Sequence, residues 1–303
     1  MKILIMGSGG VGGYYGSVLS RNGHDVKFIA RGEHLEKINS NGLIIKSVTS
    51  GNYTVKADAY DSVPINFNPE IILFTVKAYD NHDSIDIISS AMSQTTSLIT
   101  LQNGVGSSDL LKNRFPSNNI ISGVTYVDSF VTSPGNIVEQ GGPCNIIIGN
   151  QFQPNDSTVS LIRDVLAESK INIAISSSIE SEIWSKLIYI CALSGMMCIT
   201  RSSMDSILNH KETYEMTREI IEEVYLVTTA MQIGLDPNIV DHTMNQLKTN
   251  SRNIQSSMQT DLFKGKNIEV DYLNGAVSKF GKKYGVKTPI NEYIFRTLSL
   301  HNA

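Results

Sequence analysis

The chain of 303 residues is long enough for two domains, and its 41% hydrophobic and 18% charged residues are typical of a globular protein with substantial cores. A net charge of −4, without any block rich in lysine and arginine, gives no electrostatic basis for binding nucleic acid or an anionic membrane surface. No uninterrupted apolar run approaches the length of a membrane span, and the first apolar run is too short for a signal peptide, so we expect a cytoplasmic protein.

The chain opens with a β-strand, a glycine-rich turn and a helix. The apolar run Lys2–Met6 is followed by Gly7-Ser8-Gly9-Gly10-Val11-Gly12, a G-x-G-x-x-G turn. A helix over Tyr14–Asn22 and a second strand over Asp25–Ala30 complete a β-α-β unit. The glycines permit a tight bend, close approach of a pyrophosphate and close packing of the helix, whose N-terminus attracts phosphate. The unit predicts a dinucleotide site, and the alternative is a glycine-rich turn without a ligand.

The residue after the second strand bears on which dinucleotide binds. NAD-binding units usually place Asp or Glu about 20 residues beyond the glycines, where it holds the ribose 2′-hydroxyl. This chain has Ala30-Arg31 there instead. A guanidinium with no competing carboxylate can pair with a 2′-phosphate, so Arg31 predicts NADP(H) as the cofactor. The alternative is a solvated arginine at a strand end.

Further apolar runs predict a doubly wound parallel sheet. Ile71–Val76, Ser97–Leu101 and Ile120–Val124 are rich in Ile, Val and Leu and alternate little, which is typical of strands covered by helices on both faces. Between Tyr126 and Ile148 the strands alternate around the turn at residues 133–136, and we expect an antiparallel extension of the sheet edge there. A helix and a final strand, over Val159–Ser169 and Ile171–Ile175, close this first domain.

The rest of the chain shows only helical periods and predicts an all-helical second domain. We place the boundary in the serine run at 176–178, giving a Rossmann-type α/β domain over residues 1–176 and a helical domain over 177–303; Ser178 could instead be a helix N-cap. Apolar surface on the long predicted helix Thr213–Ile233 could serve a homodimer or the protein's own core. The predicted helices are about Ile179–Thr200, Thr213–Ile233, Asn238–Thr249 and Val270–Tyr284.

Cysteine and histidine usage gives no sign of a disulfide framework or a metal site. Cys144, Cys191 and Cys198 are an odd number without metal-ligand spacing, which is typical of reduced thiols. The six histidines form no H-x-x-x-H pair, so the sequence predicts no zinc site.

Polar residues that directly follow the apolar strands are the first candidates for chemistry, because ligands of open α/β sheets gather at the carboxyl ends of strands. Lys77 follows the run Ile71–Val76, and Asn103-Gly104 follows the next run. Both could face the nicotinamide end of a cofactor or a substrate anion. The alternatives are an exposed lysine that opens a helix and simple turn chemistry.

Two ionisable residues of the helical domain are further candidates. Lys186 has Ile183 and Ile190 on its face of the helix, so its ammonium group could be partly desolvated. Desolvation lowers the pKa of a lysine and would ease proton transfer to the oxyanion of a reduced ketone. The alternative is a helix-surface pair with Glu182. Glu269 precedes the last predicted helix, where the helix dipole stabilises a carboxylate in any protein.

These motifs together resemble those of the ketopantoate reductases, the 2-dehydropantoate 2-reductase family, from the glycine-rich turn almost to the C-terminus. The resemblance implies a Rossmann domain with a helical domain, NADPH as hydride donor, and reduction of the branched 2-oxo acid ketopantoate to pantoate, a step of pantothenate biosynthesis. The matching segments are the glycine-rich turn with Arg31, Val76–Asp80, Gln102–Gly106, Trp184–Leu187, Ser256–Gln259 with Asp261, and Glu269–Gly275.

The resemblance also implies roles for individual residues. Lys186 would be the general acid for the substrate ketone, and Glu269 a partner of substrate and lysine. Lys77 and Asn103 would line the nicotinamide and substrate region, and Ser257 would contact the substrate.

The chain departs from the family at two positions. The family commonly places asparagines four and eight residues after the catalytic lysine, where they contact substrate; here these positions are Ile190 and Ser194. Ser194 can still donate a hydrogen bond to substrate, whereas Ile190 cannot. Loss of one amide costs at least about 1 kcal/mol of binding or signals a less polar substrate. The chain could therefore reduce ketopantoate, reduce a different 2-oxo acid, or be a non-catalytic NADP(H)-binding sensor, although a sensor needs neither Lys186 nor Glu269.

Overall fold

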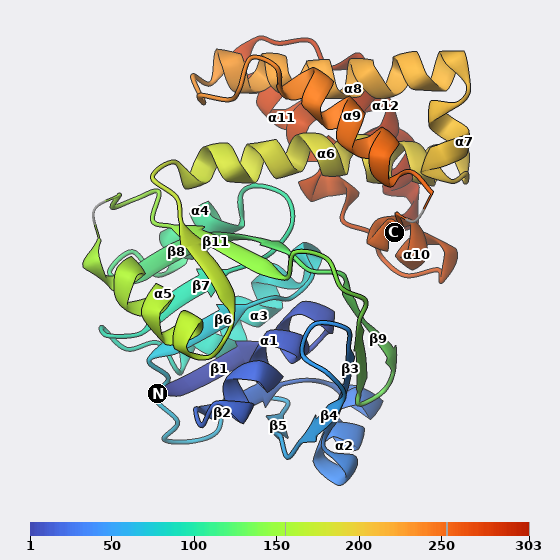
Figure 1. Cartoon of the computed structure of the whole chain (residues 1–303). Helices are drawn as coiled ribbons and strands as arrows, with labels where there is room; N and C mark the ends of the chain where they lie inside the picture. The colour runs from blue at the N-terminus through green and yellow to red at the C-terminus, as the bar shows by residue number, and fades with distance from the viewer. Residues whose placement is uncertain (155, 253, 303) are drawn as a thin grey trace. The chain divides into compact units, whose positions relative to one another are not determined.

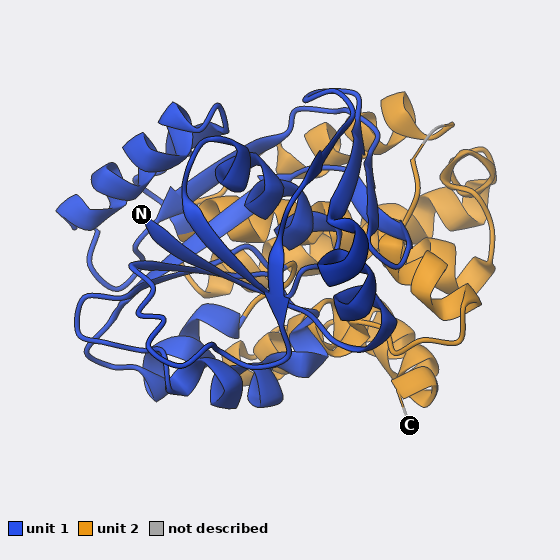
Figure 2. Ribbon diagram, turned by 90° about the horizontal axis from the view of Figure 1, so that it is seen from below, with its two compact units in different colours: residues 1–102, 106–179 blue, residues 103–105, 180–303 orange. Residues whose placement is uncertain are grey.

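The computed structural model describes residues 1–154, 156–252 and 254–302, and the chain divides into two compact units. Unit 1 comprises residues 1–102 and 106–179, and unit 2 comprises residues 103–105 and 180–303 (Figure 2). The observed division falls three residues beyond the expected boundary at 176. It also assigns the loop Asn103–Val105, which lies far upstream in the chain, to the helical unit.

Unit 1 is built on an eight-stranded sheet (Figure 1). All neighbours from β5 to β8 in the spatial order pair in parallel, whereas β11 pairs antiparallel to β8. The chain order reverses between β1 and β6, and doubly wound sheets bind ligands outside the carboxyl ends of the strands at such a switch point. In spatial order the strands are β12 (Asn172–Ile175), β11 (Asn145–Gly149), β8 (Asn119–Tyr126), β7 (Ser97–Thr100), β6 (Ile71–Phe74), β1 (Lys2–Met6), β2 (Asp25–Ile29) and β5 (Asp58–Tyr60).

The strands of this sheet are buried on both faces, which explains their unbroken apolar runs. In β1, Ile3 and Ile5 belong to one hydrophobic core, and Leu4 and Met6 belong to another, because successive side chains point to opposite faces. The doubly wound α/β fold predicted from the sequence is confirmed. The helices that contribute to the first core are α1 (Gly10–Arg21), α2 (Gly32–Asn41) and α5 (Ser157–Glu168), and those that contribute to the second are α3 (Asn81–Ser89) and α4 (Ser107–Arg114).

The antiparallel extension of the main sheet expected between Tyr126 and Ile148 is confirmed for β11, which pairs antiparallel to β8, but it is wrong for the hairpin at residues 133–136. The strands β9 (Ser129–Ser133) and β10 (Asn136–Glu139) do form an antiparallel hairpin, but β10 pairs with β3 (Leu43–Ser47), which in turn pairs with β4 (Tyr53–Val55). These four strands make a separate sheet. The sequence patterns had assigned no strand to residues 43–60, so they offered β10 no partner outside the main sheet. The main sheet is extended instead by β11 and β12.

A buried carboxylate, Glu139, fastens the small sheet to the loops around it. Its Oε2 accepts hydrogen bonds from the Ser47 hydroxyl (2.5 Å) and the Thr49 backbone N–H (3.0 Å), and its Oε1 accepts from the Cys144 thiol (3.2 Å) and the Gly141 N–H. Burial raises the pKa of Glu139, but these hydrogen bonds together hold that pKa below its usual value. At neutral pH the carboxylate is therefore ionised, and both of its oxygens accept hydrogen bonds.

The described residues of unit 2 form helices and the loops between them, without a strand, which confirms the predicted helical second domain. The helix expected over residues 270–284 is interrupted at Leu273, whose φ of −108° and ψ of −104° lie outside the helical range. Three short helices, α7, α10 and α12, were not predicted. The elements are α6 (Ile179–Thr200), α7 (Met204–Leu208), α8 (Lys211–Ala230), α9 (Ile239–Asn250), α10 (Ser257–Phe263), η2 (Val270–Tyr272), α11 (Asn274–Tyr284), α12 (Pro289–Leu298) and η3 (Ser299–Asn302).

The core of this unit forms around α6 and α8. By length and composition alone α6 could cross a membrane, contrary to the expectation that no segment would, but 61% of its apolar window is buried inside the protein. The apolar stripe of α8, including Ile220 and Val224, is also buried, so it serves the core. The buried carboxylate of Glu223 on α8 accepts hydrogen bonds from the N–H groups of Ile290 (2.8 Å) and Asn291 (2.9 Å), and so caps the start of α12.

Candidate active site

The glycine-rich turn joins β1 to α1 at the switch point of the main sheet. At Gly7, where φ is +95°, a Cβ atom would lie 2.7 Å from Val76 Cγ1, and at Gly12 it would lie 2.2 Å from the Gly7 carbonyl oxygen. The fold itself therefore requires glycine at both positions. Gly9 is the N-cap of the 12-residue helix α1, and nothing lies within 4 Å of the position that a Cβ atom would take there. This open face at a helix N-terminus fits a pyrophosphate, whose approach a side chain would hinder.

Ser8 holds this turn in place through all three of its polar groups. Its hydroxyl and its backbone N–H donate to the Ile29 carbonyl oxygen at 2.9 and 3.1 Å. Because His34 Nδ1 accepts a hydrogen bond from the Gly135 N–H, His34 Nε2 carries the proton and donates to the Ser8 carbonyl oxygen (2.8 Å). The polar groups of Ser8 are thus used within unit 1. Gly9, Gly10 and Val11 are less buried than Ser8 and are the better candidates to face a ligand.

Arg31 follows β2 at the same edge of the sheet and forms an ion pair. Its side chain is 78% exposed, and its Nη2 donates to Asp80 Oδ2 at 2.5 Å. Asp80 ends the short turn η1 (Ala78–Asp80) that follows β6. The sequence argument for Arg31 assumed that no carboxylate competes for the guanidinium, and the structure corrects that assumption. Because β2 and β6 flank β1, the pair joins the segments on either side of the glycine-rich turn.

Lys77 lies at the start of η1 and is partly buried. The turn is fixed from the next strand, because Gln102 Nε2 donates to the Val76 carbonyl oxygen (2.8 Å) and to Asn81 Oδ1 (2.7 Å). Sequence reasoning assigned no role to Gln102 or Asn81. The only signal was their place within or beside the two motifs that follow β6 and β7.

In unit 2, Asn103 and Lys186 lie together although 83 residues separate them. Lys186 Nζ on α6 donates a hydrogen bond to Asn103 Oδ1 at 2.7 Å. The next residue, Gly104, has φ of +87°, and a Cβ atom there would lie 2.4 Å from the carbonyl oxygen of Tyr272. The bend that presents Asn103 to Lys186 therefore requires glycine.

The electrostatic environment of Lys186 suits proton donation. Burial disfavours the charged ammonium form and lowers the pKa of Lys186 from 10.5 to about 8, while the carboxylate of Glu269 acts in the opposite direction. Glu269 is only 6% exposed and precedes η2, a turn of three residues, so helix-start electrostatics explains its position poorly. The carboxylate of Glu269 is thus a charge that raises the pKa of Lys186 against the effect of burial.

Two further positions of α6, where the family commonly places asparagines, bear on substrate binding. Ile190, one turn further along, is partly buried against the hydrophobic core of unit 2. Ser194, two turns along, is 4% exposed, and its hydroxyl oxygen accepts a hydrogen bond from the Ser256 hydroxyl at 3.0 Å. Ser256 in turn caps α10, whereas Ser257, the first residue of that helix, is exposed.

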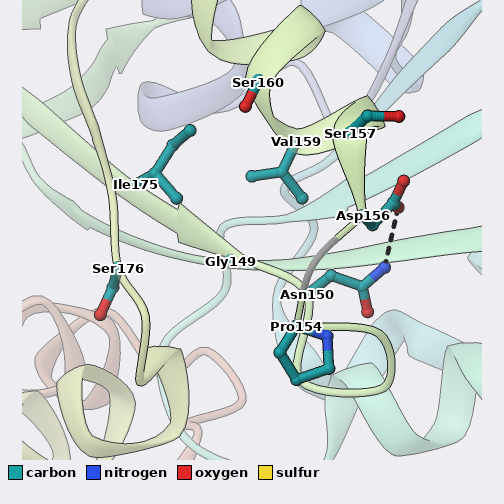
Figure 3. A pocket seen from close by; sticks show the side chains of 9 residues that line it. All are labelled: Gly149, Asn150, Pro154, Asp156, Ser157, Val159, Ser160, Ile175 and Ser176. Carbon is teal, nitrogen blue, oxygen red and sulfur yellow. Dashed lines mark hydrogen bonds between the residues drawn. The ribbon is translucent and has the colours of Figure 1, made fainter.

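A hollow of about 200 Å³ in unit 1 lies at the start of α5 (Figure 3). Its acidic residue, Asp156, is already used as a helix cap: its carboxylate accepts from the Thr158 N–H (2.9 Å) and from Asn150 Nδ2 (3.1 Å). No residue predicted to bind cofactor or substrate lines it, so we assign it no ligand. The lining residues are Gly149, Asn150, Pro154, Asp156, Ser157, Val159, Ser160, Ile175 and Ser176.

Sequence profiles of a known family match almost the whole chain. The profile of ketopantoate reductase PanE/ApbA matches residues 3–151, and the profile of the ketopantoate reductase PanE/ApbA C terminal matches residues 178–302. The chain belongs to the ketopantoate reductase family. This confirms the resemblance found in the sequence motifs, and it identifies the chain as an oxidoreductase that acts on a ketone or alcohol group.

Similar proteins cover nearly the full length of the chain. The 2-dehydropantoate 2-reductase of Pyrococcus abyssi is 29% identical over 293 residues, which are 96% of this chain and 94% of that protein. A PanE/ApbA family ketopantoate reductase from Ralstonia eutropha JMP134 is 26% identical, with a TM-score of 0.91 over 100% and 98% of the two chains. D-mandelate dehydrogenase, solved with NADH and anilino(oxo)acetate, has the same identity, TM-score and coverage. The structures of D-mandelate dehydrogenase with NADH support a nicotinamide cofactor for this chain.

Proposed function

We propose that this protein is a cytoplasmic, NADPH-dependent reductase of a 2-oxo acid, with ketopantoate as the first candidate substrate and pantoate as its product. The observation that carries the proposal is the hydrogen bond from Lys186 to Asn103, formed by an ammonium group whose pKa is lowered to about 8. Binding a dinucleotide requires neither this pair nor the buried carboxylate of Glu269. A site for proton transfer explains why all three are present.

The residues of unit 1 would hold the cofactor. The open backbone at Gly9, with Gly10 and Val11, would bind the pyrophosphate at the N-terminus of α1, and Arg31 would bind the 2′-phosphate. Lys77 would line the nicotinamide and substrate region, and the family resemblance assigns Asn103 of unit 2 to the same region. When bound, the reduced nicotinamide supplies the hydride that goes to the ketone carbon.

Lys186 would supply the proton that the ketone oxygen needs. With a pKa of about 8 its ammonium form still predominates at neutral pH, yet it releases the proton more readily than an ordinary lysine. Asn103 Oδ1 accepts one N–H and so orients the ammonium group. The negative charge of Glu269 favours the protonated form of Lys186, so the proton is available for transfer.

The test is loss of reduced-nicotinamide absorbance when the purified protein is mixed with NADPH and ketopantoate. We expect turnover by the wild type and a loss of about 100-fold or more in kcat/KM for Lys186→Ala, since general acid catalysis typically contributes that much. Lys248→Ala, at an exposed lysine of α9, is the matched control and should keep full activity. Full activity of Lys186→Ala would refute the proposed donor, and cofactor binding without turnover of any 2-oxo acid would indicate the sensor.

A second candidate is a 2-oxo acid with an apolar side chain. It is favoured by Ile190, which offers no hydrogen bond, and by the burial of Ser194, which is only 4% exposed. D-mandelate dehydrogenase, which was solved with an oxo acid carrying an aryl group, has a similar fold. The test compares ketopantoate with its analogue lacking the hydroxyl group. A preference for the analogue that Ile190→Asn reverses by about tenfold would select this candidate, and a preference of the wild type for ketopantoate would exclude it.

A further inference from the structure

The ion pair between Arg31 and Asp80 lies where the proposed cofactor site would distinguish NADPH from NADH. We propose that Asp80 is a specificity-determining residue for the cofactor, because its carboxylate competes with the 2′-phosphate of NADPH for the Arg31 guanidinium. The inference rests on the proposed NADPH site. It predicts that this chain prefers NADPH over NADH less strongly than Arg31 alone would make it.

The two partners come from opposite sides of the glycine-rich turn. Arg31 follows β2, Asp80 follows β6, and these strands flank β1 at the switch point of the sheet. The segment that carries Asp80 also packs against the turn, since a Cβ atom at Gly7 would lie 2.7 Å from Val76 Cγ1 and 2.9 Å from the Val76 nitrogen. The pair is thus beside the turn that would hold the pyrophosphate.

Asp80 is the fixed partner of the two. Its side chain is 21% exposed, and its backbone N–H donates to the Lys77 carbonyl oxygen at 2.9 Å. Gln102 fastens the residues on both sides through the Val76 carbonyl oxygen and Asn81 Oδ1. Arg31 is the exposed partner, at 78%, on a long flexible stem. A phosphate that approaches Arg31 therefore meets a guanidinium already neutralised by a carboxylate held in place.

The expected effect is moderate rather than absolute. A guanidinium has five N–H donors in a planar fork, so Arg31 can bind a phosphate on one edge while it keeps Asp80 on another. The repulsion between the carboxylate and the 2′-phosphate acts in a partly exposed setting where solvent screens charges. We therefore expect Asp80 to weaken NADPH binding by roughly 3- to 10-fold and to leave NADH, which lacks the phosphate, almost unaffected.

The test measures dissociation constants of NADPH and NADH by calorimetry, in the absence of substrate, for the wild type and Asp80→Asn. We expect the variant to bind NADPH roughly 3- to 10-fold more tightly and NADH within about 2-fold of the wild type. Asp83→Asn, which removes an exposed carboxylate from the first turn of α3, is the matched control and should leave the ratio unchanged. In an Arg31→Ala background most of the gain from Asp80→Asn should vanish.

Three results would overturn the inference: an unchanged NADPH-to-NADH ratio in Asp80→Asn, an equal gain in Asp83→Asn, or a loss of NADH affinity in Asp80→Asn. The last would make Asp80 an acceptor for the ribose hydroxyl instead of a competitor. Failure of the proposed function is distinguishable, because a wild type that binds neither dinucleotide has no cofactor site at all. A wild type that binds both with an Asp80-independent ratio loses only the present inference.

Discussion

Raising the pH through about 8 should switch off the reduction, because the reaction draws its proton from Lys186. With a pKa of about 8, Lys186 is about nine-tenths protonated at pH 7, half protonated at pH 8 and about one-tenth protonated at pH 9. An ordinary lysine, with a pKa of 10.5, would stay protonated throughout this range. The lowering corresponds to about 3 kcal/mol in favour of the neutral amine, at about 1.4 kcal/mol for each pKa unit.

The assay is the pH profile of kcat/KM for the 2-oxo acid at saturating cofactor, which reports the ionisation of the protein before substrate binds. We expect a plateau at neutral pH, half the plateau value near pH 8, about one-tenth near pH 9, and a tenfold fall for each pH unit beyond that. Glu269→Gln removes the charge that raises the pKa of Lys186, so its profile should fall at lower pH than that of the wild type. Glu182→Gln, one turn before Lys186, is the matched control.

The reasoning would be refuted by a profile that stays flat to about pH 10, because Lys186 would then not be a desolvated proton donor. The reasoning would equally be refuted if the pH profile of kcat/KM shifted in Glu182→Gln but not in Glu269→Gln. It would assign the controlling charge to the helix neighbour and leave the buried carboxylate without its proposed influence.

Three further predictions concern cofactor binding and stability. Gly9→Ala should change the free energy of unfolding by no more than about 0.5 kcal/mol in denaturation, since nothing surrounds the added methyl group. The same change should weaken dinucleotide binding about tenfold in calorimetry. A loss of stability as large as the loss of binding free energy would contradict an open phosphate site at Gly9. Glu139→Gln should lower the free energy of unfolding by about 2 kcal/mol at pH 7. Because the pKa of Glu139 is depressed in the folded state, its contribution should be lost as pH falls through that pKa, and a pH-independent difference in urea melts would argue against it. Glu223→Ala should cost about 2 kcal/mol in thermal unfolding, because two N–H groups at the start of α12 lose their acceptor, and an unchanged Tm would count against the cap.

Local patterns were sufficient for the parts of the fold that are regular and deeply buried. The run Lys2–Met6 and the helix Ile179–Thr200 were predicted with the bounds that the structure shows, because their apolar residues are unbroken or regularly spaced. The strands β3 and β4 were missed because they are short and carry mixed polarity. The pairing of β3 with β10 is also long-range, joining residues about 90 positions apart, which no local window detects.

The candidate site was predictable residue by residue but not as a set of contacts. The motifs pointed to Lys186, Asn103 and Glu269 separately, and only the fold brings the first two into hydrogen-bond contact. The partner of Arg31 was beyond the sequence for the same reason, since Asp80 lies 49 residues further along the chain. Pairings of this kind depend on which strands are neighbours, and a sequence read in order does not state that.

The assignment of Asn103–Val105 to the helical unit has a consequence for building hybrids between relatives. A chimaera that grafts a foreign C-terminal half at residue 180 would keep the native 103–105 tripeptide and so separate it from the helix with which it evolved. The sequence at the junction would show no fault, but the lysine of the grafted helix would contact an Asn103 loop from a different protein. Exchange of catalytic specificity should therefore transplant two discontinuous pieces, the tripeptide and the helices, as one inherited module.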